Sequence, residues 1–138
     1  MGNESLSLLL DTHVLVWAAE DPDKLGKTTR KLLLDPAQSL FVSAISTLEI
    51  ARLSALDQLR LSSPVGAWCE RARRELGAES VPIDDAVAAE AYALPGEFHP
   101  DPSDRLLVAT ARLLGLKLVT ADRRIVAYRG VRTQDAKK

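Results

Sequence analysis

Four acidic side chains stand at positions where they could hold a metal ion or act on a phosphate. Asp11 and Asp122 each follow a short apolar run, while Glu49 and Asp104 each lie early in a stretch whose apolar residues have helical spacing. Carboxylate oxygens are hard ligands that select Mg²⁺ or Mn²⁺. Such an ion can activate a water and stabilise charge on a phosphodiester. Together the four acids predict a divalent-metal site suited to phosphodiester hydrolysis.

The elements that must position these acids alternate along the whole chain. Strands are expected at 5–10, 40–43, 80–83 and 116–120, with a last edge strand at 131–133. Helices are expected at 13–19, 25–34, 45–59, 64–76, 103–114 and 122–128, with an Ala-rich helix after Asp84. This order predicts an α/β fold, a mostly parallel central sheet flanked by helices on both faces. Strand carboxyl ends and the helix beginnings that follow them share one edge of such a sheet, so the four acids should meet there.

Each acid also has an ordinary structural interpretation. Ser46 and Glu49 match the capping box S-x-x-E, in which the glutamate bonds back to a backbone N–H. Asp101 is a good first residue for a helix, and Asp104 would complement the dipole of that helix. Asp122 could simply cap the helix that follows it, and Asp11 could be a turn residue after a strand. For each residue taken alone, both interpretations stay open.

Several neighbouring side chains are weaker candidates. His13 is more readily a polar contact at a helix start than a ligand or base, and no role is assigned to it. Arg105 and the pair Arg123–Arg124 could contact phosphate, with solvated ion pairs to adjacent acids as the alternative. Cys69 lies on a helical pattern and is expected in the core or at an interface.

Length and composition narrow the class of protein. The chain has 138 residues, which fits one domain spanning 1–138, and its 46% hydrophobic content is that of a globular protein. A single cysteine excludes an internal disulfide, a zinc finger and a CxxC redox centre. The sequence lacks a run of about 18 apolar residues and the basic start of a signal peptide, so we expect a cytoplasmic protein without a membrane segment.

The charge balance is compatible with a nuclease. The net charge is −1, yet residues 101–138 carry nine basic and four acidic side chains. Outside the four candidate acids the chain has 15 acidic and 18 basic residues, so an acidic pit would lie in a mildly basic surface. The six aromatic residues are scattered, which argues against stacking platforms of the RRM or OB type.

The candidate acids belong to four spaced segments, L-D-T-H-V-L-V-W at 10–17, S-A-I-S-T-L-E-I at 43–50, H-P-D-P-S-D-R-L-L-V-A at 99–109 and L-V-T-A-D at 118–122. In this order they resemble the successive motifs of PIN-domain ribonucleases, and most closely those of VapC-type toxins from bacterial type II toxin–antitoxin pairs. The resemblance covers nearly the whole chain. One departure is that Thr47-Leu48 precedes Glu49 where a tryptophan often stands.

The resemblance carries specific implications. It implies that Asp11, Glu49, Asp104 and Asp122 form an acidic quartet that holds Mg²⁺ or Mn²⁺. Thr120 would be its polar neighbour and Asp101 an additional acid. It also implies endonucleolytic cleavage of RNA, a homodimer, and inhibition by a cognate antitoxin whose C-terminal segment occupies the toxin groove.

Two other interpretations compete with the nuclease. A phospho-acceptor receiver domain also gathers acids and Mg²⁺ at the edge of a parallel sheet, but it pairs two acids after the first strand, where Asp11 stands alone. A PIN-like module that only binds a partner would be expected to lack one of the four acids. Separately, apolar residues at 67–76 of the expected helix 64–76 predict an interface between subunits.

Overall fold

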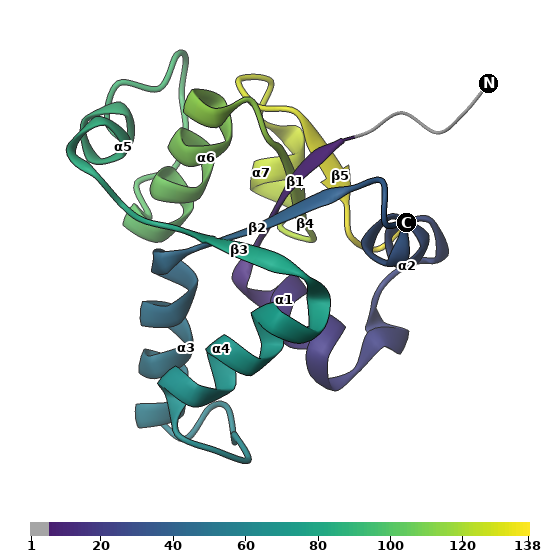
Figure 1. Ribbon diagram of the computed structural model, residues 1–138. Coiled ribbons are helices and arrows are strands. Elements are labelled where there is room, and N and C mark those ends of the chain that lie inside the picture. The colour runs from purple at the N-terminus through teal and green to yellow at the C-terminus, as the bar shows by residue number, and fades with distance from the viewer. Residues whose placement is uncertain (1–5) are drawn as a thin grey trace.

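The computed structural model describes residues 6–138 and shows a central sheet with helices on both faces (Figure 1). Within these residues the sheet has five strands, all parallel, in the order β3-β2-β1-β4-β5. The strands are β1 (Ser7–Leu10), β2 (Ser39–Ser43), β3 (Ala78–Val81), β4 (Lys117–Thr120) and β5 (Thr133–Asp135). The helices are α1 (Thr12–Glu20), α2 (Lys27–Leu34), α3 (Ala44–Ala55), α4 (Val65–Leu76), α5 (Asp85–Glu90), α6 (Pro102–Leu114) and α7 (Arg123–Ala127), with a short 3₁₀ helix η1 (Pro22–Lys24).

The expected α/β class is therefore confirmed, and the receiver alternative is excluded by the topology. Receiver domains have the strand order 2-1-3-4-5, whereas here β1 is central and lies between β2 and β4. β2 and β3 are added on one side of β1, and β4 and β5 on its other side. The switch point of the sheet therefore lies between β1 and β4. Ligands of open α/β sheets bind outside the strand carboxyl ends at this point.

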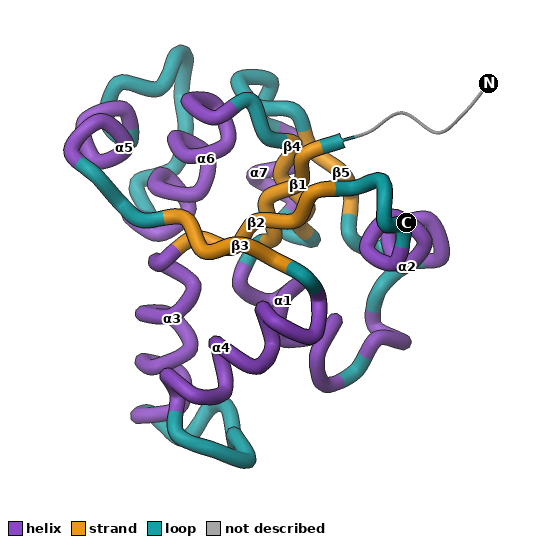
Figure 2. Tube along the Cα trace, in the orientation of Figure 1, coloured by secondary structure: helices purple, strands orange, loops and turns teal. Residues whose placement is uncertain are grey.

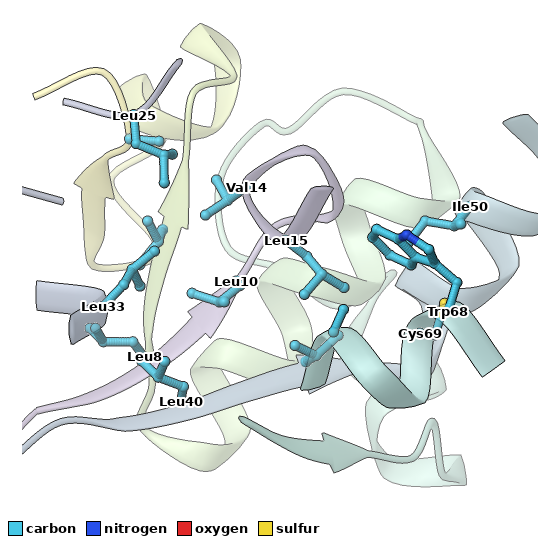
Figure 3. Packing of buried hydrophobic residues seen from close by; sticks show 14 residues of the cluster. Leu8, Leu10, Val14, Leu15, Leu25, Leu33, Leu40, Ile50, Trp68 and Cys69 are labelled. Carbon is cyan, nitrogen blue, oxygen red and sulfur yellow. The ribbon is translucent and has the colours of Figure 1, made fainter. Parts of the chain in front are cut away.

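The central strand supplies apolar side chains to both faces of the sheet. Leu8 and Leu10 point to the face that is covered by α1, α2 and α4, where they belong to the buried cluster that also includes Leu15 and Trp68 (Figure 3). Leu9 points to the opposite face and packs against α6 and α7. Because all three leucines of β1 are fully buried, this strand is a fixed base for the residue that follows it.

Helix ends follow the local sequence at several points. Asp84 and Asp101 cap α5 and α6 through their side chains, which for Asp101 agrees with the helix start expected from the sequence. Gly77 and Gly115 end α4 and α6 with φ values of 69° and 66°, a left-handed conformation that glycine adopts without strain. A single glycine thus ends each of these two helices.

The structure decides against the capping box at Ser46 and Glu49, which the sequence had left open. The side chain that caps α3 is Ser43, whose Oγ accepts a hydrogen bond from the N–H of Ile45 at 3.1 Å. Ser46 therefore lies inside the first turn and is fully buried. The helix starts one residue after β2, which turns Ser46 and Glu49 toward the carboxyl edge of the sheet.

Two edge strands lie two residues away from their expected positions. β3 occupies 78–81 instead of 80–83, and β5 occupies 133–135 instead of 131–133. In these edge strands, apolar and polar residues alternate only weakly. Each strand pairs with one neighbour, and that pairing decides its register. Ser5, which was included in the expected first strand, lies outside the described residues.

The helix expected to form a subunit interface is instead covered within the domain. Trp68, Cys69 and Ala72 of α4 are buried in the core on the α1 face of the sheet. Large exposed apolar side chains lie elsewhere, including Leu48 of α3 and Tyr92 after α5. No helix within residues 6–138 is long and apolar enough to cross a membrane.

Candidate functional site

The four candidate acids line one cavity of about 360 Å³ at the carboxyl edge of the sheet. Asp11 follows β1, Asp122 follows β4, Glu49 lies on α3 and Asp104 on the first turn of α6. The tube in Figure 2 shows β1 leading directly into α1 and β2 leading directly into α3. The cavity is also lined by His13, Trp17, Asp101, Ala121 and Arg124.

Asp11 is the most deeply buried of the four acids, and both of its carboxylate oxygens accept hydrogen bonds. The backbone N–H of Thr12 donates to Oδ1 at 2.7 Å, and the hydroxyl of Thr120 donates to Oδ2 at 2.7 Å. The Thr120 Oγ1 accepts in turn from the backbone N–H of Asp122 at 3.0 Å. One threonine thereby connects the acids that follow β1 and β4.

Glu49 is held by Thr12 rather than by the backbone of its own helix. The hydroxyl of Thr12 donates to Glu49 Oε1 at 2.6 Å and lies 2.8 Å from the hydroxyl of Ser46. Because the single hydroxyl proton of Thr12 is used toward Glu49, Ser46 donates to Thr12. This buried chain of hydroxyls fixes Glu49 beside the start of α1.

Asp104 lies at the start of α6 and contacts a histidine from the preceding loop. His99 Nε2 is 2.6 Å from Asp104 Oδ2. Asp101 caps the same helix, because its Oδ1 accepts from the N–H groups of Ser103 and Asp104 at 2.9 and 3.4 Å. Asp101 therefore caps the helix, and both Asp101 and Asp104 line the cavity.

Asp122 combines a structural and an electrostatic role. Its Oδ1 accepts from the N–H groups of Arg124 and Ile125 at 2.8 and 3.4 Å and so caps α7. The guanidinium of Arg124 lies 3.2 Å from Asp122 Oδ2 and 3.6 Å from Asp104 Oδ2. Arg124 is the cation that now sits between these two acids.

Burial and mutual repulsion act on the protonation of the site. Burial raises the pKa of Asp11, and hydrogen bonds from Thr120 and Thr12 offset this only in part. Burial likewise raises the pKa of Glu49 and of Asp104, and repulsion by the surrounding acids adds to both shifts. Partial burial also opposes the charge of Asp122, but hydrogen bonds from Arg124 lower its pKa below the usual value. For three of the four acids, the surroundings thus disfavour the charged form, and a nearby positive charge would favour it.

A sequence profile of the PIN domain matches residues 8–131, which is most of the chain. This chain belongs to the PIN-domain family. It is 38% identical over 123 residues to Ribonuclease VapC22 of Mycobacterium tuberculosis, a match that covers 89% of this chain and 92% of that protein. The resemblance to VapC-type toxins, drawn from four short segments, is confirmed by this match.

Solved structures share the fold of this PIN domain. VapBC2 from Rickettsia felis, bound to a DNA fragment from its promoter, superposes with a TM-score of 0.68 at 15% identity, covering 94% of this chain and 98% of that chain. A toxin–antitoxin complex from Klebsiella pneumoniae superposes with a TM-score of 0.58 at 23% identity, covering 90% and 94% of the two chains. At these identities the structures establish the fold.

The donor set of the PIN domain fits a hard divalent cation in its chemistry. Within residues 6–138, no group of three or more histidine, cysteine, aspartate or glutamate side chains is already arranged to hold a metal ion. Glu49 Oε2 and Asp104 Oδ1 nevertheless accept no hydrogen bond from the described residues, and both acids have a raised pKa. A cation would supply the missing positive charge, in competition with Arg124 and His99 for the same carboxylates.

The arginines expected near phosphate have other contacts. Arg105 donates three hydrogen bonds to the backbone carbonyls of Ala91, Phe98 and His99 at 3.0, 2.7 and 3.0 Å, so it anchors the loop before α6. Arg123 forms a bidentate pair with Asp135 at 2.7 and 2.8 Å. Of the arginines considered from sequence, only Arg124 lines the acidic cavity.

Sequence reasoning assigned no role to Thr12 or His99, the residues that hold Glu49 and Asp104. Both lie inside the quoted motifs, Thr12 directly after Asp11 and His99 at the start of H-P-D-P-S-D. His13 lines the cavity but is exposed, with its ring centroid 6.0 Å from that of Trp17. Its role stays unassigned.

Proposed function

We propose that this chain is a Mg²⁺- or Mn²⁺-dependent endoribonuclease and the toxin of a toxin–antitoxin pair. The convergence of Asp11, Glu49, Asp104 and Asp122 on one cavity of a PIN domain carries the proposal. The 38% identity with a protein named as a ribonuclease supports RNA as the substrate. All four acids are present, which favours the nuclease over the PIN-like module that only binds.

In this proposal Asp11, Glu49, Asp104 and Asp122 hold the divalent ion. When bound, the ion activates a water and stabilises the negative charge that develops on the phosphodiester. Thr120 and Thr12 orient Asp11 and partly offset the effect of burial on its charge, since both donate to its carboxylate. Thr12 does the same for Glu49, and His99 orients Asp104.

Electrostatics account for why substrate and ion would bind together. An empty cluster of acids repels the phosphates of RNA, and neutralising that cluster removes the repulsion. Basic residues predominate outside the cluster, with 18 against 15 acids, and these can contact phosphates along the strand. Arg124, 61% exposed at the side chain and directly beside Asp104 and Asp122, is the nearest of them.

The relatives favour a protein partner. Solved relatives with this fold are named as VapBC and toxin–antitoxin complexes. We therefore propose a cognate antitoxin for this chain, together with the homodimer and the cytoplasmic location expected from the sequence. Sedimentation of the purified toxin at micromolar concentration tests the dimer, because a single 15.0 kDa species would contradict it.

Cleavage of a mixed RNA substrate tests the nuclease. The wild-type chain should degrade long single-stranded RNA in Mg²⁺ or Mn²⁺ and should be inactive in EDTA. Asp11→Asn should abolish cleavage, because it removes one ligand charge from the buried end of the site. Asp57→Asn is the matched control, since Asp57 is exposed with φ at 56°, where asparagine is equally tolerated.

Two results would contradict the proposal. One is wild-type cleavage that persists in EDTA after removal of bound metal. The other is cleavage by Asp11→Asn at the rate of the Asp57→Asn control.

A further inference from the structure

A second and larger cavity adjoins the acidic one and is not used by the proposed chemistry. It has a volume of about 720 Å³ and is formed by residues 95–99, before α6, together with Arg124 and residues 127–130 at the end of α7. We call it the aromatic pocket. This volume lies within the range of small-molecule sites in proteins, which is about 300–1,000 Å³.

The aromatic pocket is continuous with the acids through two side chains. Arg124 lines both cavities. His99 lines the aromatic pocket, while its Nε2 lies 2.6 Å from Asp104 Oδ2. A group in the aromatic pocket would therefore be a direct neighbour of a group held at the acids.

Three rings line this pocket and are held in place by the surrounding chain. The ring centroids of Phe98 and Tyr128 are 4.8 Å apart, and those of Phe98 and His99 are 4.2 Å apart. Tyr128 Oη donates to the carbonyl of Pro95 at 2.5 Å. Its ring also occupies the space beside Gly130, where an added Cβ would come within 2.3 Å of the ring. The pocket is thus built before any ligand enters.

Among the residues that line the pocket, basic side chains outnumber acidic ones, although Arg124 is also paired with Asp104 and Asp122. Arg124 and Arg129 are exposed and line the pocket, against one acid, Glu97. An occupant that combines a flat aromatic ring with negative charge matches this lining. A nucleotide has that combination, because its base can pack against aromatic rings while its phosphate meets an arginine.

We propose that the aromatic pocket binds the base of an unpaired RNA nucleotide that flanks the phosphodiester at the acids. This inference rests on the proposed function and names the feature of the RNA that the site recognises. The base packs against Phe98, His99 and Tyr128, and the adjoining phosphates lie at Arg124 and Arg129. An unpaired base is favoured, since a base within a duplex would first have to unpair and leave its stack, which costs free energy.

A protein segment is the other class of macromolecule that could enter the pocket. The observations favour RNA because the pocket adjoins the site where the phosphodiester is proposed to be cut. They also favour RNA because the arginines that line the pocket complement a polyanion. Binding of a protein partner is treated as an outcome of the test.

The variant that tests the pocket is Ala127→Phe. Ala127 is exposed and lines the pocket at the end of α7, so a phenylalanine there fills the pocket without removing a core contact. Ala67→Phe is the matched control, because Ala67 is an exposed helical alanine on α4 that lines neither cavity. Gly130→Ala is a second variant that displaces the Tyr128 ring from beneath, in case Ala127→Phe fails to fold.

The first measurement is binding in EDTA, which does not depend on cleavage. The probes are a mixed-sequence eight-nucleotide RNA and a chain of the same length in which every base is replaced by hydrogen. The wild type and Ala67→Phe should bind the RNA about tenfold more tightly than the baseless chain. In Ala127→Phe this ratio should fall close to one. Repulsion by the acids affects both probes equally and leaves the ratio unchanged.

The second measurement is cleavage of a randomised 12-nucleotide RNA pool in Mg²⁺, followed by sequencing of the products. The wild type should show a base preference at one position flanking the cut, and Ala127→Phe should lose this preference while still cleaving. If Ala127→Phe retains both the binding ratio and the preference, the aromatic pocket does not bind a base. If instead it loses affinity for a purified antitoxin with RNA binding unchanged, the pocket is a protein-docking site and the proposal is wrong.

The two proposals fail in different ways. No cleavage by the wild type, with the binding ratio near ten, would overturn the nuclease and leave the base pocket. Metal-dependent cleavage, with a binding ratio near one in the wild type, would overturn the pocket and leave the nuclease.

Discussion

The hydroxyl of Thr120 lies 2.7 Å from Oδ2 of Asp11, although the two residues are 109 positions apart in the chain. Thr120 ends β4 and Asp11 follows β1, and these strands are neighbours in the sheet. Because Thr120 Oγ1 also accepts from the N–H of Asp122, it couples the two strand-end acids of the site. A threonine hydroxyl can do both, since it is at once donor and acceptor.

Thr120→Val should impair both stability and cleavage. Valine keeps the shape but leaves Asp11 Oδ2 and the Asp122 N–H without partners in a buried site, at a cost of about 1–3 kcal/mol in the free energy of unfolding. The pKa of Asp11 should rise further, because a hydrogen bond that lowers it is lost. Urea unfolding and the rate of RNA cleavage measure the two effects. Thr120→Ser, which retains the hydroxyl, should restore most of the activity, and equal losses in both variants would contradict the role.

Neutralising Glu49 should stabilise the metal-free protein at neutral pH. Burial raises the pKa of Glu49 above its usual 4.5. A raised pKa means that folding favours the protonated form, so this contribution to stability is present below pH 4.5 and is lost as pH rises through the folded-state pKa. Glu49→Gln should therefore melt about 2–4 °C higher than wild type at pH 7 in EDTA, with a smaller difference at pH 4. If the melting temperature of Glu49→Gln lies below that of wild type by the same amount at pH 7 and at pH 4, the predicted stabilisation is wrong.

Divalent metal should stabilise the folded chain. An ion that binds only the native state adds about 2.7 kcal/mol at a concentration of one hundred times its dissociation constant. MgCl₂ or MnCl₂ should raise the melting temperature of wild type and of Asp57→Asn, and should do so much less for Asp104→Asn. The control for screening is KCl at equal ionic strength. The same shift in all three proteins would indicate that the acids do not hold the ion.

Breaking the pair between Arg123 and Asp135 should remove an acid-sensitive part of the stability. Hydrogen bonds from Arg123 lower the pKa of Asp135 from 3.8 to about 2. A lowered pKa gives stability that is present above pH 3.8 and is lost as pH falls toward 2. Arg123→Ala should lower the melting temperature by a few degrees at most at pH 7, because the pair is partly screened by solvent, and by less at pH 2. Arg74→Ala, at an exposed arginine of α4, should show no such dependence on pH.

Replacing Arg105 should loosen the loop that carries His99. The planar guanidinium reaches three carbonyls at once, and its centre lies 4.8 Å from the ring centroid of Tyr92. Lysine cannot reproduce three bonds in this fork geometry, so Arg105→Lys should cost about 1–3 kcal/mol and slow cleavage by displacing His99 from Asp104. Hydrogen exchange of residues 95–101 measures the loosening. Unchanged exchange with reduced activity would point instead to a direct contact between Arg105 and RNA.

The sequence by itself determined the order of elements, the α/β class and the convergence of the four candidate acids on one cavity. Hydrophobic periodicity is a local property, so strands of period two and helices of period 3.6 are visible without any tertiary contact. The position of Asp11 and Asp122 after apolar runs predicted that they meet, because all strands of a parallel sheet end at the same edge. The four motifs then indicated the family, which the PIN-domain match confirmed.

The tertiary structure alone decided which atoms pair within the site. Glu49 matched a capping box locally, yet its partner is Thr12, 37 residues away, because α3 begins at Ala44 and turns Glu49 toward α1. Arg105 and Arg123 adjoin acids in sequence but bind loop carbonyls and Asp135. The aromatic pocket joins two segments, 95–99 and 127–130, whose proximity comes from packing against the same face of the sheet. Such partners depend on how elements distant in the chain pack, and no local pattern of residues encodes that distance.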